Sequence, residues 1–237
     1  MNLIADIGNT RTKFYLFEKD EIVKHFVFKN EEIEAIKSCL DSLDFKKMIV
    51  SATSDLESFY AKYSFLLLTN KTQIPIGIDY KTPKTLGTDR IALAVGAQHL
   101  FPQKNCLIIG TGTCITLDFI DKNASYQGGA ISPGLTLRLQ SLHTFTDKLP
   151  LIKPEATKTF FDLTGKSTEE SIESGVFNGT FAEIDGIIYR YKQIYEELTV
   201  ILTGGDQEIF ALNLKNTIFA HANIQAIGLN TILNYNE

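Results

Sequence analysis

The alternation of hydrophobic and polar positions predicts that the chain opens with two strands around a tight turn. The segments 3–5 and 14–17 are apolar, and Gly8-Asn9-Thr10 between them has the residues typical of a turn. A third strand is expected at 22–28, where apolar positions again recur in an extended pattern. The beginning of the chain therefore predicts a hairpin followed by a further strand.

After these strands, the spacing of apolar residues changes to that of a helix. Asn30 is expected to cap a helix whose apolar positions run from Ile33 to Leu43. A second strong helical pattern starts at Thr88, with Ile91 and Val95 placed to face a core. Between the two helices, the pattern predicts strands at 48–52 and 65–68 and a capping box formed by Ser54 and Glu57.

The second half of the chain opens in the same way as the first. A buried strand at 106–109 leads into the glycine and threonine turn Gly110–Thr113, and 115–120 is expected to return as a strand. This repeat of strand, turn and strand favours a duplicated fold, and a chance likeness of two hairpins is the alternative.

Glycines mark the remaining pattern. A capping box of Ser167 and Glu170 starts a helix that carries Gly175 and Gly179 on one face, which predicts close packing of its backbone against a neighbour. The other elements expected are a turn at 128–134 before a helix, a strand at 200–202 that leads into Gly204-Gly205, and a final helix at 224–234.

Composition and charge argue against several classes of protein. The 237 residues carry a formal net charge of −5 and no run of Lys or Arg, so no nucleic-acid partner is expected. We expect no membrane span and no secretion signal, because no apolar stretch approaches roughly 18 residues and no basic segment precedes the first one. The three cysteines, Cys39, Cys106 and Cys114, fit neither a disulfide framework nor a zinc site, which favours free thiols in the cytoplasm.

The first turn, DIGNT at Asp6–Thr10, is a candidate phosphate site. Backbone N–H groups of such a turn can cradle phosphate oxygens, and Asp6 at the strand end can hold Mg²⁺ through water. Lys13 can reach the same phosphate as a point charge. An ordinary hairpin capped by Asp6 is the alternative interpretation.

Two further glycine turns repeat this chemistry. GTGT at Gly110–Thr113 and LTGGD at Leu202–Asp206 each follow a predicted buried strand. Each turn taken singly is more often structural, but three in this order favour a nucleotide site.

Gly87-Thr88-Asp89-Arg90 opens the second predicted helix. Asp89 is either a residue that only stabilises the helix N-terminus or a general base for a substrate hydroxyl, with Arg90 holding a carboxylate or amide. The spacing of the residues leaves both roles open.

The order of these motifs resembles the type III pantothenate kinases, which belong to the superfamily of sugar kinases, actin and Hsp70-type ATPases. The resemblance extends from Asp6 to the C-terminal helix and rests on DIGNTRTK, Y…P..LGTDR, GTCIT, GGAISPG, ST..SIESG and LTGGD. It implies an α/β fold of two ribonuclease-H-like, actin-like ATPase domains with a nucleotide cleft between them. We expect these domains at 1–104 and 105–237.

The resemblance also implies an activity. A type III pantothenate kinase uses ATP and Mg²⁺, with a monovalent cation such as K⁺ or NH₄⁺, to convert pantothenate into 4'-phosphopantothenate. This is the first step of coenzyme A biosynthesis. The resemblance further implies a homodimer with substrate pockets near the interface.

Individual residues match the family's functional positions. Asp89 matches the catalytic proton acceptor, and Thr113 matches the threonine of the second phosphate loop. The pantothenate-binding positions match Tyr80, Gly87, Thr88, Asp89, Arg90 and Thr168. The first ATP-phosphate segment matches Asp6, Ile7, Gly8, Asn9, Thr10, Arg11, Thr12 and Lys13.

Two positions depart from the family pattern. Gly110 stands where the family usually has an aspartate that ligates the monovalent cation, and Thr88 replaces a more usual alanine. The glycine favours a second hypothesis, a catalytically weak or silent regulatory, nucleotide-sensing member of the family. A third hypothesis keeps the fold but changes the acceptor to a sugar or another polyol.

Overall fold

The computed structural model describes residues 1–8, 11–52, 62–153 and 158–236, which form two compact units. The first unit comprises residues 1–102, 124–126 and 223–237, and the second comprises residues 103–123 and 127–222. The boundary expected between residues 104 and 105 lies near the first change of unit. The final helix, expected with the C-terminal half, instead groups with the first unit because it packs there against α3.

The first unit is built on a five-stranded sheet in the order β3-β2-β1-β4-β5. β1 pairs antiparallel with β2, β2 antiparallel with β3, and β4 parallel with both β1 and β5. The strands span β1 Asn2–Ile7, β2 Arg11–Glu18, β3 Glu21–Lys29, β4 Lys47–Ala52 and β5 Leu66–Leu67. The strands predicted at the start of the chain are therefore confirmed.

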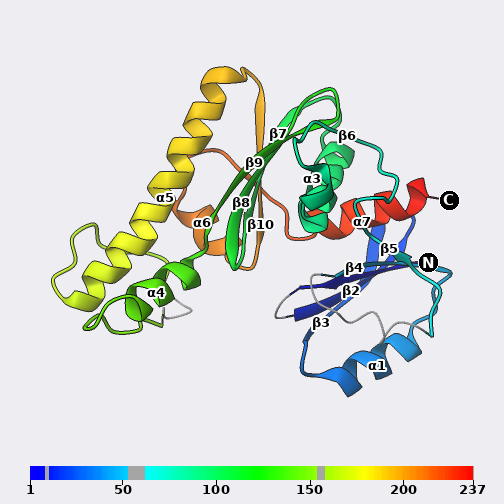
Figure 1. Cartoon of the computed structure of the whole chain (residues 1–237), viewed down its shortest axis with the longest axis horizontal. Helices are drawn as coiled ribbons and strands as arrows, with labels where there is room; N and C mark the ends of the chain where they lie inside the picture. The colour runs from blue at the N-terminus through cyan, green and yellow to red at the C-terminus, as the bar shows by residue number, and fades with distance from the viewer. Residues whose placement is uncertain (9–10, 53–61, 154–157, 237) are drawn as a thin grey trace. The chain divides into compact units, whose positions relative to one another are not determined.

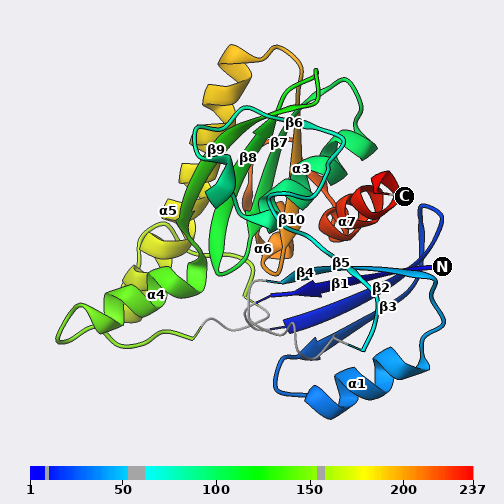
Figure 2. The ribbon, with the colours of Figure 1, turned by 45° about the vertical axis from the view of Figure 1, so that its right-hand side comes forward.

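Helices cover both faces of this first sheet. α1 (Ile33–Ser42) buries Ile36 and Leu40 against one face, and α7 (Ile224–Tyr235) lies on the other (Figures 1 and 2). α3 (Thr88–Leu100) packs against α7. The 3-10 turn η1 (Pro83–Thr85) precedes α3. The capping box predicted at Ser54 and Glu57 lies outside the described residues.

Asn30 does not cap α1, and that prediction is wrong. The N-cap residue of α1 is Glu32. The Asn30 side chain instead accepts a hydrogen bond from Thr12 Oγ1 at 3.0 Å and donates one to the carbonyl of Gly8 at 2.8 Å. Asn30 therefore braces the first glycine turn.

The second unit repeats the topology of the first. Five strands of its six-stranded sheet follow the order β9-β8-β7-β10-β11, and β6 (Gly77–Ile78) pairs with β9 at the edge. β7 is antiparallel to β8, and β10 is parallel to β7 and β11. The strands span β7 Asn105–Thr111, β8 Cys114–Ile120, β9 Ser125–Pro133, β10 Leu198–Gly204 and β11 Phe219–Ala220. Numbered within each unit, both sheets read 3-2-1-4-5, so the predicted duplication is confirmed.

Of the turn expected at 128–134, residues 128–133 form a strand instead, and Gly134 is the N-cap residue of α4 (Leu135–Thr144). Residues 128–133 form most of β9, and Gly129 lies so close to β8 that an added Cβ would stand 1.7 Å from the carbonyl oxygen of Leu117. The first two residues of β9, Ser125 and Tyr126, group with the first unit, where they pair with β6 (Gly77–Ile78).

Three helices pack on the second sheet and build its core. They are α4 (Leu135–Thr144), α5 (Thr168–Ile194) and α6 (Gln207–Asn213). The capping box of α5 is confirmed, since Ser167 Oγ accepts from the N–H of Glu170 at 3.2 Å. In the part of the chain that the structure describes, no helix combines the length and apolar character needed to cross a bilayer.

Candidate active site

In the first unit, the candidate catalytic carboxylates Asp6 and Asp89 lie near enough to repel each other. Asp6 stands near the carboxyl end of β1, and Lys13 is its direct partner across the antiparallel pair β1–β2, so both side chains lie on one face. Burial raises the pKa of Asp6 to about 6, the Lys13 charge counteracts this, and the Asp89 charge raises the pKa further. Asp89 is therefore close enough to Asp6 to affect its ionisation, while the choice between its two roles stays a prediction.

A residue that the sequence did not indicate completes this group. Gln225, in the first turn of α7, donates a hydrogen bond from Nε2 to Asp6 Oδ1 at 2.9 Å. Tyr15, two residues after Lys13 on β2, has its pKa raised to about 12 by burial and then by the Asp6 charge. The carboxylate of Asp6 thus lies among residues of β1, β2, α3 and α7.

The rest of the first turn supports the backbone of this site. Ile7 and Thr12 are buried, so their side chains face the core and leave ligand contact to their backbone groups. The N–H of Gly8 donates to the carbonyl of Arg11 at 3.0 Å, which closes the hairpin, while Arg11 itself is exposed. Asn9 and Thr10 lie outside the described residues.

The segment predicted to bind the acceptor forms the start of α3. Gly87 is the N-cap residue, and Asp89 lies in the first turn. A Cβ at Gly87 would stand 2.5 Å from Asp89 Oδ1, so the glycine lets the carboxylate fold back over the helix start. Asp89 and Thr88 are both half-buried, which leaves them accessible to a small ligand.

In the same unit, Arg90 lies beside Tyr126, which in turn lies beside Tyr80. The Arg90 side chain is buried, with Cζ 5.9 Å from the ring centroid of Tyr126, a cation–π distance. The Tyr126 ring lies 6.1 Å from that of Tyr80, one of the predicted acceptor-binding residues. The sequence did not identify Tyr126 as a site residue, because its ring contact with Tyr80 depends on the parallel pairing of β6 with β9.

The second and third glycine turns meet in the second unit. The register of β7 and β10 places Gly204 beside Thr111, and Thr111 Oγ1 donates to the carbonyl of Thr203 at 2.8 Å. Gly204 has φ +111°, and a Cβ there would stand 2.1 Å from the Thr111 carbonyl oxygen. The backbone N–H of Asp206 also donates to this oxygen at 3.2 Å, so the LTGGD turn is fixed to the GTGT strand.

Thr113 lies exposed at the tip of the GTGT turn. The N–H of Gly134, the N-cap residue of α4, donates to the Thr113 carbonyl at 3.0 Å, and a Cβ at Gly134 would clash with Gly112. Gly134, at the end of GGAISPG, therefore packs against the second glycine turn and donates a hydrogen bond to it. Gly110, at the family's cation position, lies in the body of β7 opposite Thr116 and Thr203 and supplies no carboxylate.

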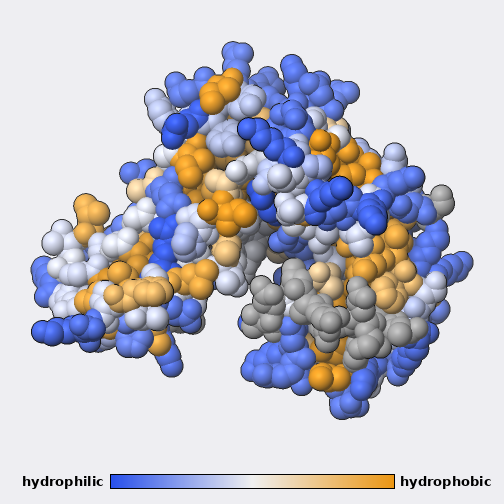
Figure 3. Space-filling model, in the orientation of Figure 1, coloured by the Kyte–Doolittle hydropathy of each residue, from blue (hydrophilic) through white to orange (hydrophobic). Residues whose placement is uncertain are grey.

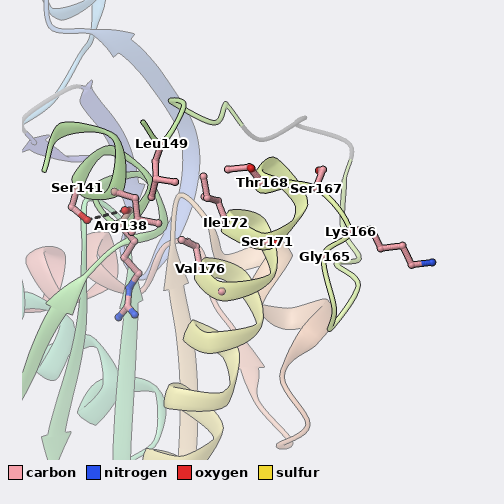
Figure 4. Close-up of a pocket in the computed structure, with 12 residues that line it drawn as sticks. Arg138, Ser141, Leu149, Gly165, Lys166, Ser167, Thr168, Ser171, Ile172 and Val176 are labelled. Atoms are coloured by element: carbon pink, nitrogen blue, oxygen red, sulfur yellow. Dashed lines mark hydrogen bonds between the residues drawn. The ribbon is translucent and has the colours of Figure 1, made fainter. Parts of the chain in front are cut away.

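Thr168, the remaining predicted acceptor residue, lines a cavity of about 970 Å³ in the second unit. The cavity lies between α4 and the start of α5, and Ser141, Ser167 and Ser171 add further hydroxyl groups to its wall (Figure 4). Lys166 points away from the cavity in this view. The guanidinium of Arg138 is bound to Glu183 at 2.7 Å, so its charge is already paired.

Solved structures with low sequence identity share this fold. A conserved putative Baf family transcriptional activator from Campylobacter jejuni superposes with a TM-score of 0.66 at 20% identity, covering 99% of this chain and 98% of that one. A putative N-acetylmannosamine kinase from Listeria monocytogenes superposes with a TM-score of 0.55 at 12% identity, covering 99% and 98%. These likenesses establish the actin-like fold of two ribonuclease-H-like halves.

Sequence comparison is more specific than fold comparison. The family model described as type III pantothenate kinase matches residues 2–190. A type III pantothenate kinase from Flavobacterium johnsoniae is 42% identical over 242 residues, which cover 99% of this chain and 98% of the relative. With both the family model and a full-length relative in agreement, this chain belongs to the type III pantothenate kinase family.

Proposed function

We propose that this chain transfers the γ-phosphoryl group of ATP to the primary hydroxyl of pantothenate, and so begins coenzyme A biosynthesis. The observation that carries the proposal is the proximity of Asp6 and Asp89 in one unit, with Lys13 opposite Asp6. Phosphoryl transfer depends mainly on positioning and on charge stabilisation, and these residues are suited to both tasks. We also propose that the reaction takes place in the cytoplasm, consistent with three free thiols.

In the proposed division of roles, the first glycine turn and Lys13 hold the phosphates of ATP. Asp6 would hold Mg²⁺ through water, and the ion would supply charge neutralisation at the phosphate oxygens. The donor set fits this ion, because the Asp6 and Asp89 carboxylates lie near enough to interact and carboxylate oxygens favour a hard cation. Such a set suits a cation that keeps most of its waters and binds substrate phosphates.

Asp89 is the proposed general base. As the pantothenate oxygen attacks the γ-phosphorus, its proton passes to the Asp89 carboxylate and ADP leaves with the bridging oxygen. The proposed pantothenate contacts in the first unit are Arg90, Tyr80, Gly87 and Thr88. Thr168, in the second unit, stays a prediction from the resemblance alone. A silent regulatory role is the weaker hypothesis, because Asp6, Lys13 and Asp89 stand together in this chain.

We further propose that the chain acts as a homodimer through α5. Among the described residues, no atom lies within 4 Å of a Cβ built on Gly175 or Gly179, so the close packing expected at these glycines is not made within the chain. Apolar side chains gather over α4 and the start of α5 (Figure 3), and Phe145, Phe160 and Leu163 are 83%, 74% and 84% exposed. A second copy would cover both features.

A kinase assay with a matched variant tests the catalytic proposal. Wild-type protein with ATP and pantothenate should yield ADP and 4'-phosphopantothenate. Asp89→Asn should fold normally and lose about 10²–10⁴-fold in kcat, because a general base typically contributes that factor. Wild-type turnover in a folded Asp89→Asn protein would contradict the role, and absence of pantothenate-dependent turnover in the wild type would contradict the function.

The same assay tests the role of Gly110. A glycine offers no carboxylate to a monovalent cation, so we expect rates in K⁺ or NH₄⁺ to exceed those in a bulky organic cation only weakly. Steep, saturating activation by low millimolar K⁺ would show that other groups replace the missing carboxylate.

Asp6→Asn should stabilise the protein while impairing nucleotide use. The native state binds the Asp6 proton more tightly than the unfolded state, so wild-type stability falls as pH rises from about 4 to about 6. Above that window, the ionised group costs roughly 1–3 kcal/mol, which the neutral amide avoids. Urea unfolding at pH 8 and pH 4.5 should show the gain at pH 8 and little at pH 4.5. An equal difference at both pH values would refute this.

Light scattering tests the homodimer. The wild type should have the mass of two chains, and Gly179→Leu should have the mass of one. A Cβ at this position meets no described atom within 4 Å outside the neighbouring backbone of its own helix, so we expect the variant to stay folded by circular dichroism. A single-chain mass for the wild type, or an intact dimer for Gly179→Leu, is the result against the proposal.

A further inference from the structure

The helix α7 is fastened to the strand that carries Asp6 at two separate points. At one end, Gln225 Nε2 donates to Asp6 Oδ1 at 2.9 Å. At the other end, Asn2 Nδ2, from the first residue of β1, donates to Asn230 Oδ1 at 2.9 Å and to Asn234 Oδ1 at 2.7 Å. The helix therefore lies along β1 with its first turn at the active-site end.

The spacing of these bonds matches the geometry of the two elements. From Gln225 to Asn234 a helix rises about 13 Å, and from Asp6 to Asn2 a strand spans about 13 Å. The hydrogen bonds that side-chain amides donate at the two ends can therefore form together without strain. The position of Gln225 relative to Asp6 is set by this register as well as by its own hydrogen bond.

A third contact packs α7 against the neighbouring helix α3. A Cβ at Gly228 would stand 1.9 Å from the carbonyl oxygen of Ala92, and one at Gly96 would stand 2.2 Å from that of Ile224. The backbones of α3 and α7 thus touch next to Gln225. Because α3 carries Asp89 in its first turn, α7 contacts both elements that hold the candidate carboxylates.

The chemistry of the amide suits a supporting role. Gln225 donates one hydrogen bond to Oδ1, which orients the carboxylate but leaves its negative charge in place. Because this bond is made to Oδ1, the amide of Gln225 does not occupy Oδ2. A lysine at the same position would neutralise the charge and compete with the cation.

From this geometry we propose that Gln225 is a positioning residue for the kinase reaction. It holds the Asp6 carboxylate in the orientation that Mg·ATP requires and touches neither substrate itself. The inference rests on the proposed function in so far as Asp6 serves ATP, and it goes beyond that function by giving the C-terminal helix a part in nucleotide binding.

The test compares Gln225→Met with Asn234→Ala. The first variant keeps the length of the side chain and removes the donor to Asp6. The second removes an amide contact at the far end of the same helix and serves as the control for a purely structural effect. For both, we would measure unfolding by urea, Mg·ATP affinity by calorimetry and the KM for each substrate.

Gln225→Met should weaken Mg·ATP affinity and lower kcat/KM for ATP by roughly 5- to 50-fold, since small misplacements of reacting groups have effects of this order. The KM for pantothenate should change less than twofold, and Asn234→Ala should keep wild-type kinetics. Calorimetry decides the role of Gln225 even if pantothenate proves not to be the acceptor. The proposal is overturned if Gln225→Met binds Mg·ATP as the wild type does, if both variants lose affinity in step with stability, or if the wild type binds no ATP.

Discussion

The candidate active site depends on the contact between α3 and α7, two helices whose backbones meet through glycine. Gly96 and Gly228 each stand so close to the opposite helix that no side chain fits between them. The contact joins α3 to α7, and α7 in turn packs on β1 and β4. Gln225 of α7 lies beside Asp6, and Asp89 lies at the start of α3. The placement of the candidate carboxylates in the first unit therefore depends on helix packing.

The same packing holds the carboxylate of Asp6 where its ionisation is unfavourable. Burial disfavours ionisation of Asp6 most, and repulsion by the Asp89 charge adds to this. A cation near these carboxylates would relieve the repulsion, so the site is less stable when empty than when loaded. The arrangement is typical of functional sites, where groups with perturbed pKa values are held together by the surrounding fold. A hairpin with only a structural role would not require a buried carboxylate beside a second one.

Features that depend on local sequence could be predicted, and features that depend on distant partners could not. The first hairpin, the capping box at Ser167 and the repeat of strand, turn and strand all follow from neighbouring residues. Asn30 was assigned to a helix cap because its true partner, Thr12, lies 18 residues away. Gln225 gave no signal at all, since Asp6 is 219 positions earlier. Gly175 and Gly179 were expected to pack closely against a neighbour, and among the described residues no such neighbour lies within 4 Å of a Cβ at either position.

The central claim is that the glycine contact between α3 and α7 supports the carboxylate site. The most direct measurement is the unfolding free energy and Mg·ATP affinity of Gly228→Ala, compared with Gly186→Ala, whose added Cβ meets no described atom within 4 Å. Gly228→Ala should lose roughly 1–3 kcal/mol of stability from overpacking and bind Mg·ATP more weakly. Gly186→Ala should bind Mg·ATP normally and be as stable as the wild type or more stable by up to about 1 kcal/mol. Wild-type stability and Mg·ATP affinity in Gly228→Ala would contradict the claim.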